Sequence, residues 1–200
     1  MFSYIEGLLV EKSPALAVID CGGVGFKLNI SLNTYSQLKE INLKCKLFTH
    51  LAIKSEATNP VGLVLYGFFT EDERSLFQEL ISVNGVGYNT ARLILSSLTT
   101  NETVSAISNG DILTFRKVKG IGEKTAQRII IELRDKISKV SGSKEILTSV
   151  GNTLSNEALT ALIMLGFNRN AALKAIDKVI KNEGVNITLE DIIKQSLKLL

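Results

Sequence analysis

The chain has 200 residues, of which 45% are hydrophobic and 22% charged, and its formal net charge is only +3. This length accommodates one large domain or two to three small ones, each with enough residues to bury a core. Because the charge is close to balanced, a surface for nucleic acid would have to come from local clusters of Lys and Arg rather than from general basicity.

Neither a membrane segment nor a metal site is expected from the residue pattern. No apolar run reaches the roughly 18 residues of a membrane-spanning helix, and the first residues lack the basic and apolar regions of a signal peptide. Cys21 and Cys45 stand apart from each other and from the single histidine, His50. We therefore expect reduced thiols, no metal, no cofactor and a cytoplasmic location.

Residues 1–66 have the pattern of a small β-barrel. Short β-branched and apolar runs alternate with turns and predict strands over 4–10, 15–20, 24–30, 43–54 and 61–67, with a brief helix over 31–38 capped by Ser31. Five or six strands with one short helix are typical of an OB-like Greek-key barrel. The polar residues Lys54, Ser55 and Glu56 occupy the tip between the last two strands, and the residue pattern by itself favours a plain turn there.

Residues 67–140 are predicted to form a second domain, which is all-helical from about residue 70. Thr70 and Glu73 have the spacing of a capping box and begin a helix over 70–81. Further helices are predicted over 88–98, 101–108, 111–117 and 123–140 from the spacing of apolar residues.

One motif occurs twice in this helical region. The segment 83–94, with sequence VNGVGYNTARLI, is followed by the segment 118–129, with sequence VKGIGEKTAQRI, 35 residues later when counted from Gly85 to Gly120. In both copies two glycines flank one aliphatic residue and precede a helix. Glycine permits positive φ and close approach, and a helix N-terminus leaves amide N–H groups without partners, so each copy is suited to holding a phosphate.

A single copy would equally fit an ordinary turn, but two copies in the same register favour paired helix-hairpin-helix motifs. Neither copy matches a P-loop or a dinucleotide-binding loop. The predicted phosphate-binding residues are Gly85, Val86, Gly87, Asn89, Lys119, Gly120, Ile121, Gly122, Lys124 and Arg128. Other Lys and Arg residues cluster around the second copy, and about half of them are explained by a solvated helix face.

The last part of the chain is predicted to be separate. Residues 141–153 are small and polar without a period, which predicts a flexible linker. Residues 154–200 then predict a three-helix bundle with caps at Ser155, Asn168 and Thr188, and with Leu197 and Leu200 buried. Such a small tethered bundle suits docking to a partner, and a merely stabilising appendage is the alternative. The whole chain is thus predicted to be a multidomain α+β protein.

With these parts in order, the chain resembles the RuvA family of Holliday-junction-binding subunits of the bacterial branch-migration complex. The resemblance lies in the strand ends at 48–50 and 65–68, in both hairpin copies, and in the tail segments 158–162 and 165–167. It implies a homotetramer, one or two per four-way junction, that holds the junction open and square during recombination, DNA repair and the SOS response.

The resemblance also implies partners and residue roles. The bundle would contact a hexameric RuvB-type ATPase through Leu162, Leu165 and Phe167, and a RuvC-type resolvase would act on the same junction. The chain itself would be a non-catalytic subunit of an ATP-dependent helicase complex. The tip Lys54-Ser55-Glu56 would form an acidic pin at the crossover.

This chain departs from the family pattern at three positions. Ser55 stands where the pin usually carries its first acid, so Glu56 is alone. Asn89 and Glu123 stand where family members often have Lys in the two hairpins. Phosphate binding should therefore depend mainly on the backbone amides of the glycine corners.

A DNA-binding repair nuclease, or the accessory subunit of one, is the alternative, because such proteins share paired hairpins. A nuclease would need carboxylates able to hold a divalent metal. The tight acidic run 71–73 is explained by its position at a helix N-terminus. A protein scaffold without affinity for DNA is a third alternative.

Overall fold

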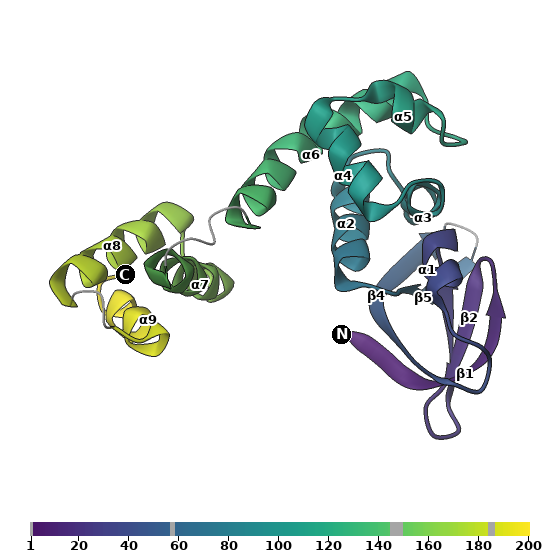
Figure 1. Cartoon of the computed structure of the whole chain (residues 1–200), viewed down its shortest axis with the longest axis horizontal. Coiled ribbons are helices and arrows are strands. Elements are labelled where there is room, and N and C mark those ends of the chain that lie inside the picture. Colours follow the sequence, from purple (N-terminus) through teal and green to yellow (C-terminus); the bar gives the residue numbers. More distant parts are fainter. Residues whose placement is uncertain (1, 57–58, 145–149, 184–186) are drawn as a thin grey trace. The chain divides into compact units, whose positions relative to one another are not determined.

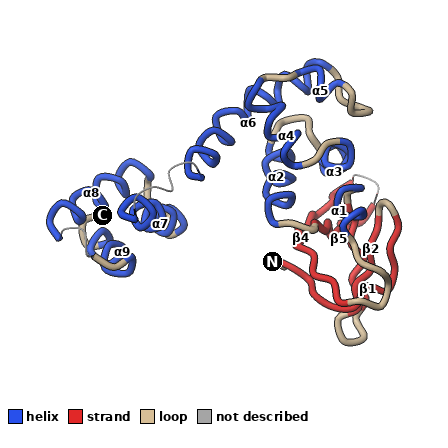
Figure 2. Tube along the Cα trace, in the orientation of Figure 1, coloured by secondary structure: helices blue, strands red, loops and turns tan. Residues whose placement is uncertain are grey.

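The computed structural model describes residues 2–56, 59–144, 150–183 and 187–200 (Figure 1). Its contacts divide the chain into two units, Met1–Ser138 and Lys139–Leu200. All described strands belong to the first unit, and helices occur in both (Figure 2).

The first unit begins with a closed five-stranded barrel in the order β1-β2-β3-β5-β4. Its strands are β1 (Tyr4–Ser13), β2 (Leu16–Asp20), β3 (Gly25–Ile30), β4 (Lys44–Glu56) and β5 (Asn59–Phe68). β3 and β5 run parallel, whereas the other neighbours are antiparallel and β4 returns to pair with β1. The helix α1 (Leu32–Gln37) connects β3 to β4 and is capped by Ser31. The predicted OB-like barrel is therefore confirmed.

Alternation of side chains along the strands fills the barrel. Leu9, Ile19, Leu28 and Leu47 are fully buried, and each lies between more exposed strand neighbours. Cys45 belongs to the same core as a free thiol, and burial raises its pKa. The barrel interior is thus filled by its own side chains.

Five helices complete the first unit: α2 (Glu71–Ser82), α3 (Tyr88–Ser97), α4 (Thr100–Asn109), α5 (Ile112–Arg116) and α6 (Glu123–Lys144). Thr70 caps α2 by accepting from the Glu73 N–H, but the Glu73 carboxylate does not return to Thr70, so only half of the predicted capping box exists. A complete box forms instead at α4, where the Thr99 N–H donates to Glu102 and lowers the pKa of that carboxyl.

An aromatic contact joins the barrel to the helices. Tyr66 and Phe68 of β5 lie 5.1 Å and 4.8 Å from Phe77 of α2, measured between ring centroids, and Tyr88 of α3 stacks on Tyr66 at 5.7 Å. His50 lies in the same group, where burial lowers its pKa. A single apolar core therefore runs from β5 into the helices.

The second unit is a three-helix bundle, as predicted, formed by α7 (Val150–Met164), α8 (Arg169–Glu183) and α9 (Leu189–Leu197). Its core contains Ala158, Leu162, Ala172, Ile176 and Ile192. The prediction was wrong at two points. α7 begins before Ser155, which therefore lies inside the helix instead of capping it, and Leu197 and Leu200 are 39% and 40% exposed rather than buried.

The segment 141–153, predicted as a linker, falls partly outside the described residues. α6 continues to Lys144 and α7 begins at Val150, so helix extends farther into the segment from both sides than its composition indicated. Residues 145–149 are not described. The linker and the domain boundaries at 66 and 140 stay predictions.

One glycine of the barrel leaves no room for a side chain. A Cβ added to Gly7 in β1 would lie 2.1 Å from the Asp20 carbonyl oxygen of β2. We expect Gly7→Ala to lower the free energy of unfolding by about 2 kcal/mol, because the strand pair has to separate locally. Urea unfolding would measure this change.

Gly62→Ala in β5 is the matched control, since nothing lies within 4 Å of its added Cβ. It should leave the unfolding free energy unchanged or slightly raised. Equal stabilities for the two variants would contradict the steric argument.

Candidate nucleic-acid interface

The first glycine corner lies between α2 and α3. The Val86 N–H donates to the Val83 carbonyl at 3.0 Å and closes the turn, while Gly85 between them has φ of +89°. Val83 and Val86 are buried, and Gly85 and Gly87 are exposed. The aliphatic residues therefore hold the turn on the core and leave the glycine backbone at the surface.

The second corner, between α5 and α6, repeats this geometry. The Ile121 N–H donates to the Val118 carbonyl at 3.1 Å, and Gly120 has φ of +88°. Val118 and Ile121 are buried, and both glycines of the corner, at 120 and 122, are exposed. The predicted repeat of 35 residues is thus a repeat of backbone structure.

Each corner leads directly into the N-terminus of a helix. Gly87 is the N-cap of α3 and makes no side-chain capping bond, and the Ala91 N–H is the donor to its carbonyl, at 3.0 Å. Amides of the first turn therefore have no acceptor within the helix. The Ala126 N–H donates to Gly122 in the same way at 3.0 Å. Free N–H groups and the positive end of the helix dipole both suit a phosphate.

Val86 and Ile121 do not have the role that was predicted for them. Their side chains are 4% and 6% exposed, and their N–H groups are occupied within the turns. Neither residue therefore offers a donor to a ligand. Each is the anchor that keeps the neighbouring glycines at the surface.

The two corners are tied together by Arg128. This side chain of α6 donates from Nη1 to the Asn84 carbonyl at 2.9 Å, and the same nitrogen lies 3.5 Å from the Cβ position of Gly85. The helix of the second copy thus contacts the turn of the first. Arg128 was predicted to bind phosphate directly, whereas in the structure one of its nitrogens supports the first corner.

Positive charge collects next to the second corner. Lys119 and Lys124 are exposed, and neither takes part in an ion pair among the residues that the structure describes. By contrast, Lys136 farther along α6 pairs with Glu79 at 3.2 Å. Asn89 at the first corner is exposed and uncharged. Because Arg128 of α6 brings its guanidinium to the first corner, both corners have a cation that makes no ion pair among the described residues.

The predicted pin residues lie at the end of β4. Lys54, Ser55 and Glu56 are the last residues of that strand, and their side chains lie outside the described part of the chain. Just before them, Ile53 pairs with Leu63 of β5 across the hairpin, and the two side chains are 62% and 70% exposed.

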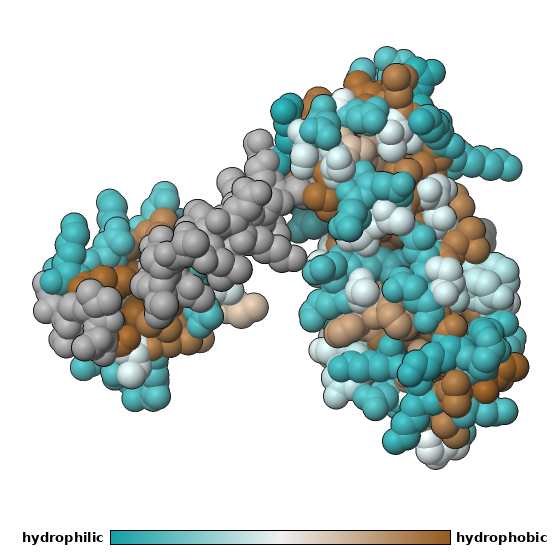
Figure 3. Space-filling view, viewed as in Figure 1, coloured by the Kyte–Doolittle hydropathy of each residue, from teal (hydrophilic) through white to brown (hydrophobic). Residues whose placement is uncertain are grey.

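The predicted docking residues of the bundle differ in exposure. Leu162 is fully buried in the bundle core and Phe167 packs against that core, so Leu162 is not available to a partner. Leu165 is 60% exposed, and its neighbour Met164, which the sequence analysis had not singled out, is 84% exposed. Figure 3 shows apolar atoms on the surface of this unit.

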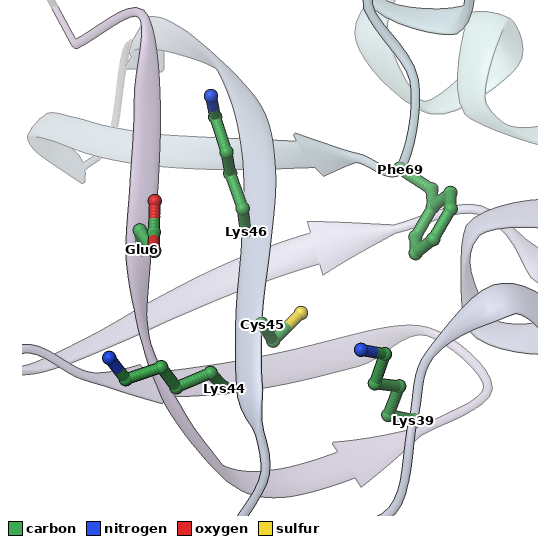
Figure 4. A pocket seen from close by; sticks show the side chains of 6 residues that line it. All are labelled: Glu6, Lys39, Lys44, Cys45, Lys46 and Phe69. Atoms are coloured by element: carbon green, nitrogen blue, oxygen red, sulfur yellow. The ribbon is translucent and has the colours of Figure 1, made fainter.

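A cavity of about 300 Å³ opens beside β4 in the barrel. Its lining residues are Glu6, Lys39, Lys44, Cys45, Lys46 and Phe69 (Figure 4). The ammonium groups of Lys44 and Lys46 point in different directions, and Lys46 lies 4.0 Å from the ring centroid of Tyr4. These cations do not converge on one point, so the cavity lacks the geometry of an anion site.

No helix among the described residues is long and apolar enough to cross a membrane. In the same part of the chain, no group of three or more His, Cys, Asp and Glu side chains could hold a metal ion.

Comparison with curated proteins gives full-length relatives. One from Christiangramia forsetii is 45% identical over 200 residues, one from Flavobacterium psychrophilum is 46% identical over 198 residues, and one from Bacteroides fragilis is 44% identical over 208 residues. The matches cover 99% to 100% of this chain and of each relative. The chain belongs to the RuvA family.

Family models divide the chain in the same order as its folded parts. The RuvA N terminal domain matches residues 1–67, the SAM-like Helix-hairpin-helix tandem matches 77–135, and the RuvA C-terminal domain matches 153–200. The three relatives are each named Holliday junction branch migration complex subunit RuvA. These findings support the RuvA prediction rather than the nuclease alternative.

Two residues of the candidate sites could not be found from the sequence pattern. Asn84 acts through a backbone carbonyl, which any residue type has. Met164 lies in a run of apolar residues at the end of α7. Which residues of this run are buried depends on how the helix packs against its neighbours. Neither residue had a signal in the sequence.

Removing the tie between the corners should loosen the first one. We expect Arg128→Met to lower the free energy of unfolding by about 1 kcal/mol, the usual net contribution of one such hydrogen bond, and to speed amide hydrogen exchange around residues 83–87. Lys124→Met, one turn earlier on α6, is the control and should change neither. Identical exchange in both variants would argue against the tie.

Proposed function

We propose that this chain binds Holliday junctions without reading their sequence and holds them open for branch migration. The observation that carries this proposal is the pair of exposed glycine corners with one backbone geometry, joined by Arg128. Two such corners, held at a constant separation, suit the regularly spaced phosphates of one duplex arm.

Contacts of this kind select DNA structure, not sequence. Backbone amides at helix N-termini bind phosphate oxygens, which are identical in every base pair. Lys119 and Lys124 would add charge at the second corner, whereas Asn89 adds none at the first. We therefore expect the affinity to fall with salt less steeply than for a RuvA protein with lysines in both hairpins.

We also propose assembly as a homotetramer, with one or two tetramers on each junction. The pin hairpin would lie at the crossover, where Glu56 of each copy repels phosphates and helps to separate strands. The exposed apolar pair Ile53 and Leu63 at the base of this hairpin supports contact between copies.

The terminal bundle would recruit the motor in the cytoplasm. We propose that a hexameric RuvB-type ATPase docks on the apolar end of α7, at Met164 and Leu165, and that a RuvC-type resolvase acts on the same junction. The exposure of these two side chains is the evidence for this docking surface. Leu162 is buried in the bundle core and would contribute by packing rather than by contact with the partner.

In this proposal the chain is a non-catalytic subunit, and ATP hydrolysis belongs to the partner. Incubation of the purified chain with a labelled four-way junction and Mg²⁺ would separate it from the nuclease alternative. A shifted but intact junction is expected. Cleaved strands would overturn the proposal in favour of a nuclease.

Changing both corners should abolish junction binding. Gly85 and Gly120 have positive φ, which an L-residue adopts only with strain, so the double variant Gly85→Ala, Gly120→Ala should turn the amides away from the phosphates. We expect at least about a tenfold loss of affinity for a four-way junction in gel shifts, equivalent to about 1.4 kcal/mol.

Gly110→Ala is the matched control for this variant. Gly110 also has positive φ, +70°, and space for a Cβ, but it is the C-cap of α4 and belongs to neither corner. It should cost stability without changing DNA affinity. Undiminished binding by the double variant, or equal loss in the control, would remove the corners from the proposed interface.

Replacing the exposed apolar residues at the C-terminal end of α7 and just after it should separate DNA binding from motor recruitment. The double variant Met164→Glu, Leu165→Glu puts charge on the proposed docking surface without touching the bundle core. We expect pull-down of the RuvB-type ATPase to fall about tenfold while junction gel shifts stay unchanged. Glu157→Gln, at another exposed position of α7, is the control, and equal pull-down by both variants would place the docking surface elsewhere.

A further inference from the structure

A buried carboxylate joins the barrel to the helical part of the first unit. Glu73 of α2 is 3% exposed, and its two oxygens accept from two hydroxyls of the barrel, Ser31 Oγ and, at 2.7 Å, Thr34 Oγ1. Ser31 and Thr34 are themselves fully buried. The contact therefore joins residues about 40 positions apart in the chain without any exposed group.

This arrangement is specific in geometry. Ser31 Oγ also accepts from the Thr34 N–H at 3.0 Å, and Thr34 Oγ1 accepts from the Phe69 N–H at 3.1 Å, where β5 leads into α2. Among the described residues Glu73 has no ion pair, and the partners of its two side-chain oxygens are the two hydroxyls. An apolar side chain would fill such a site without requiring this geometry, which indicates that the carboxylate serves to fix position.

A second set of hydrogen bonds attaches the same barrel helix to α3. Asn33 Nδ2 donates to the Leu95 carbonyl at 2.6 Å and to the Leu98 carbonyl at 2.9 Å, so it caps the last turn of α3. The Leu32 N–H donates to Ser96 Oγ at 3.1 Å nearby. Figure 1 shows α1 between the barrel strands and α3.

The two attachments hold both helices that flank the first corner. α2 leads into this corner and is held at its N-terminus by Ser31 and Thr34, while α3 leads out of it and is held at its C-terminus by Asn33. Arg128 then links the second corner to the first through its hydrogen bond to the Asn84 carbonyl.

Two exposed arginine contacts also join the barrel to these helices, since Arg74 Nη1 donates to the Ser3 carbonyl at 3.2 Å and Arg92 Nη1 donates to the Ala15 carbonyl at 3.3 Å. The hydrogen bonds of α1 differ from them in being buried or half-buried.

We propose that Glu73 and Asn33 are positioning residues, which fix the direction of the glycine corners relative to the β4–β5 hairpin and thereby make the chain prefer a four-way junction to a plain duplex. This inference rests on the proposed function. A duplex needs only the corners, because it presents phosphates alone. A junction requires in addition that the bound arm leads to the crossover at which the hairpin acts.

The test compares two DNA substrates, a synthetic immobile four-way junction and a duplex as long as two of its arms, by fluorescence anisotropy with the full chain. Glu73→Ala and Asn33→Ala should each reduce the ratio of junction affinity to duplex affinity about tenfold, which is about 1.4 kcal/mol, and leave duplex affinity within about twofold. Energy transfer between dyes on neighbouring arms should show that the bound junction is less open.

Matched controls lie beside each residue. Ser75 is an exposed polar residue of α2 two positions after Glu73, and Ser36 is an exposed polar residue of α1. Ser75→Ala and Ser36→Ala should keep the wild-type ratio. Circular dichroism and duplex binding together establish that each variant is folded.

Equal losses of affinity for junction and duplex would overturn the inference, because Glu73 and Asn33 would then serve stability alone. An unchanged affinity ratio in both variants would also overturn it. A wild-type chain that binds duplex and junction equally would instead overturn the proposed function itself. The measurements on the wild type and on the variants therefore separate the two.

Discussion

The proposed DNA interface depends on one local constraint, a glycine with positive φ held beside a buried aliphatic residue. At both corners the aliphatic N–H closes the turn and the side chain enters the core, and this fixes the adjacent backbone at the surface. If the anchor moved, the amides of the following helix would no longer point at one place. Lysines alone could not replace this arrangement, because their long side chains fix no direction.

Other contacts of the first unit fix how the glycine corners are oriented relative to the barrel. An aromatic group centred on Phe77 joins the barrel to α2 and α3 through apolar contact, and the buried Glu73 network adds contacts that are satisfied in one geometry only. Apolar packing tolerates small rotations, whereas a carboxylate held by two hydroxyls tolerates few. The combination suits a protein that has to place a barrel hairpin and two phosphate-binding corners on one branched DNA.

Local features of the sequence were predicted well wherever one element contains all the information. Strand alternation, the caps at Ser31 and Thr188, and the two glycine corners depend on residues within a few positions of one another. Predictions were wrong where a side chain had a choice of partners. Glu73 has the spacing to close its own capping box, but it turns instead to Ser31 and Thr34, which are buried with it.

Periodicity and glycine placement act over short distances, so the amino-acid pattern was enough to predict the strands and helices, the repeated glycine motif and the resemblance to the RuvA family. Long-range packing was needed to show that Arg128 joins the two corners through Asn84, that Val86 and Ile121 are anchors, and that Met164 is exposed while Leu162 is buried. These depend on contacts between residues far apart in the chain, and a hydrogen-bond donor or an apolar side chain has many possible partners until packing brings one of them within reach.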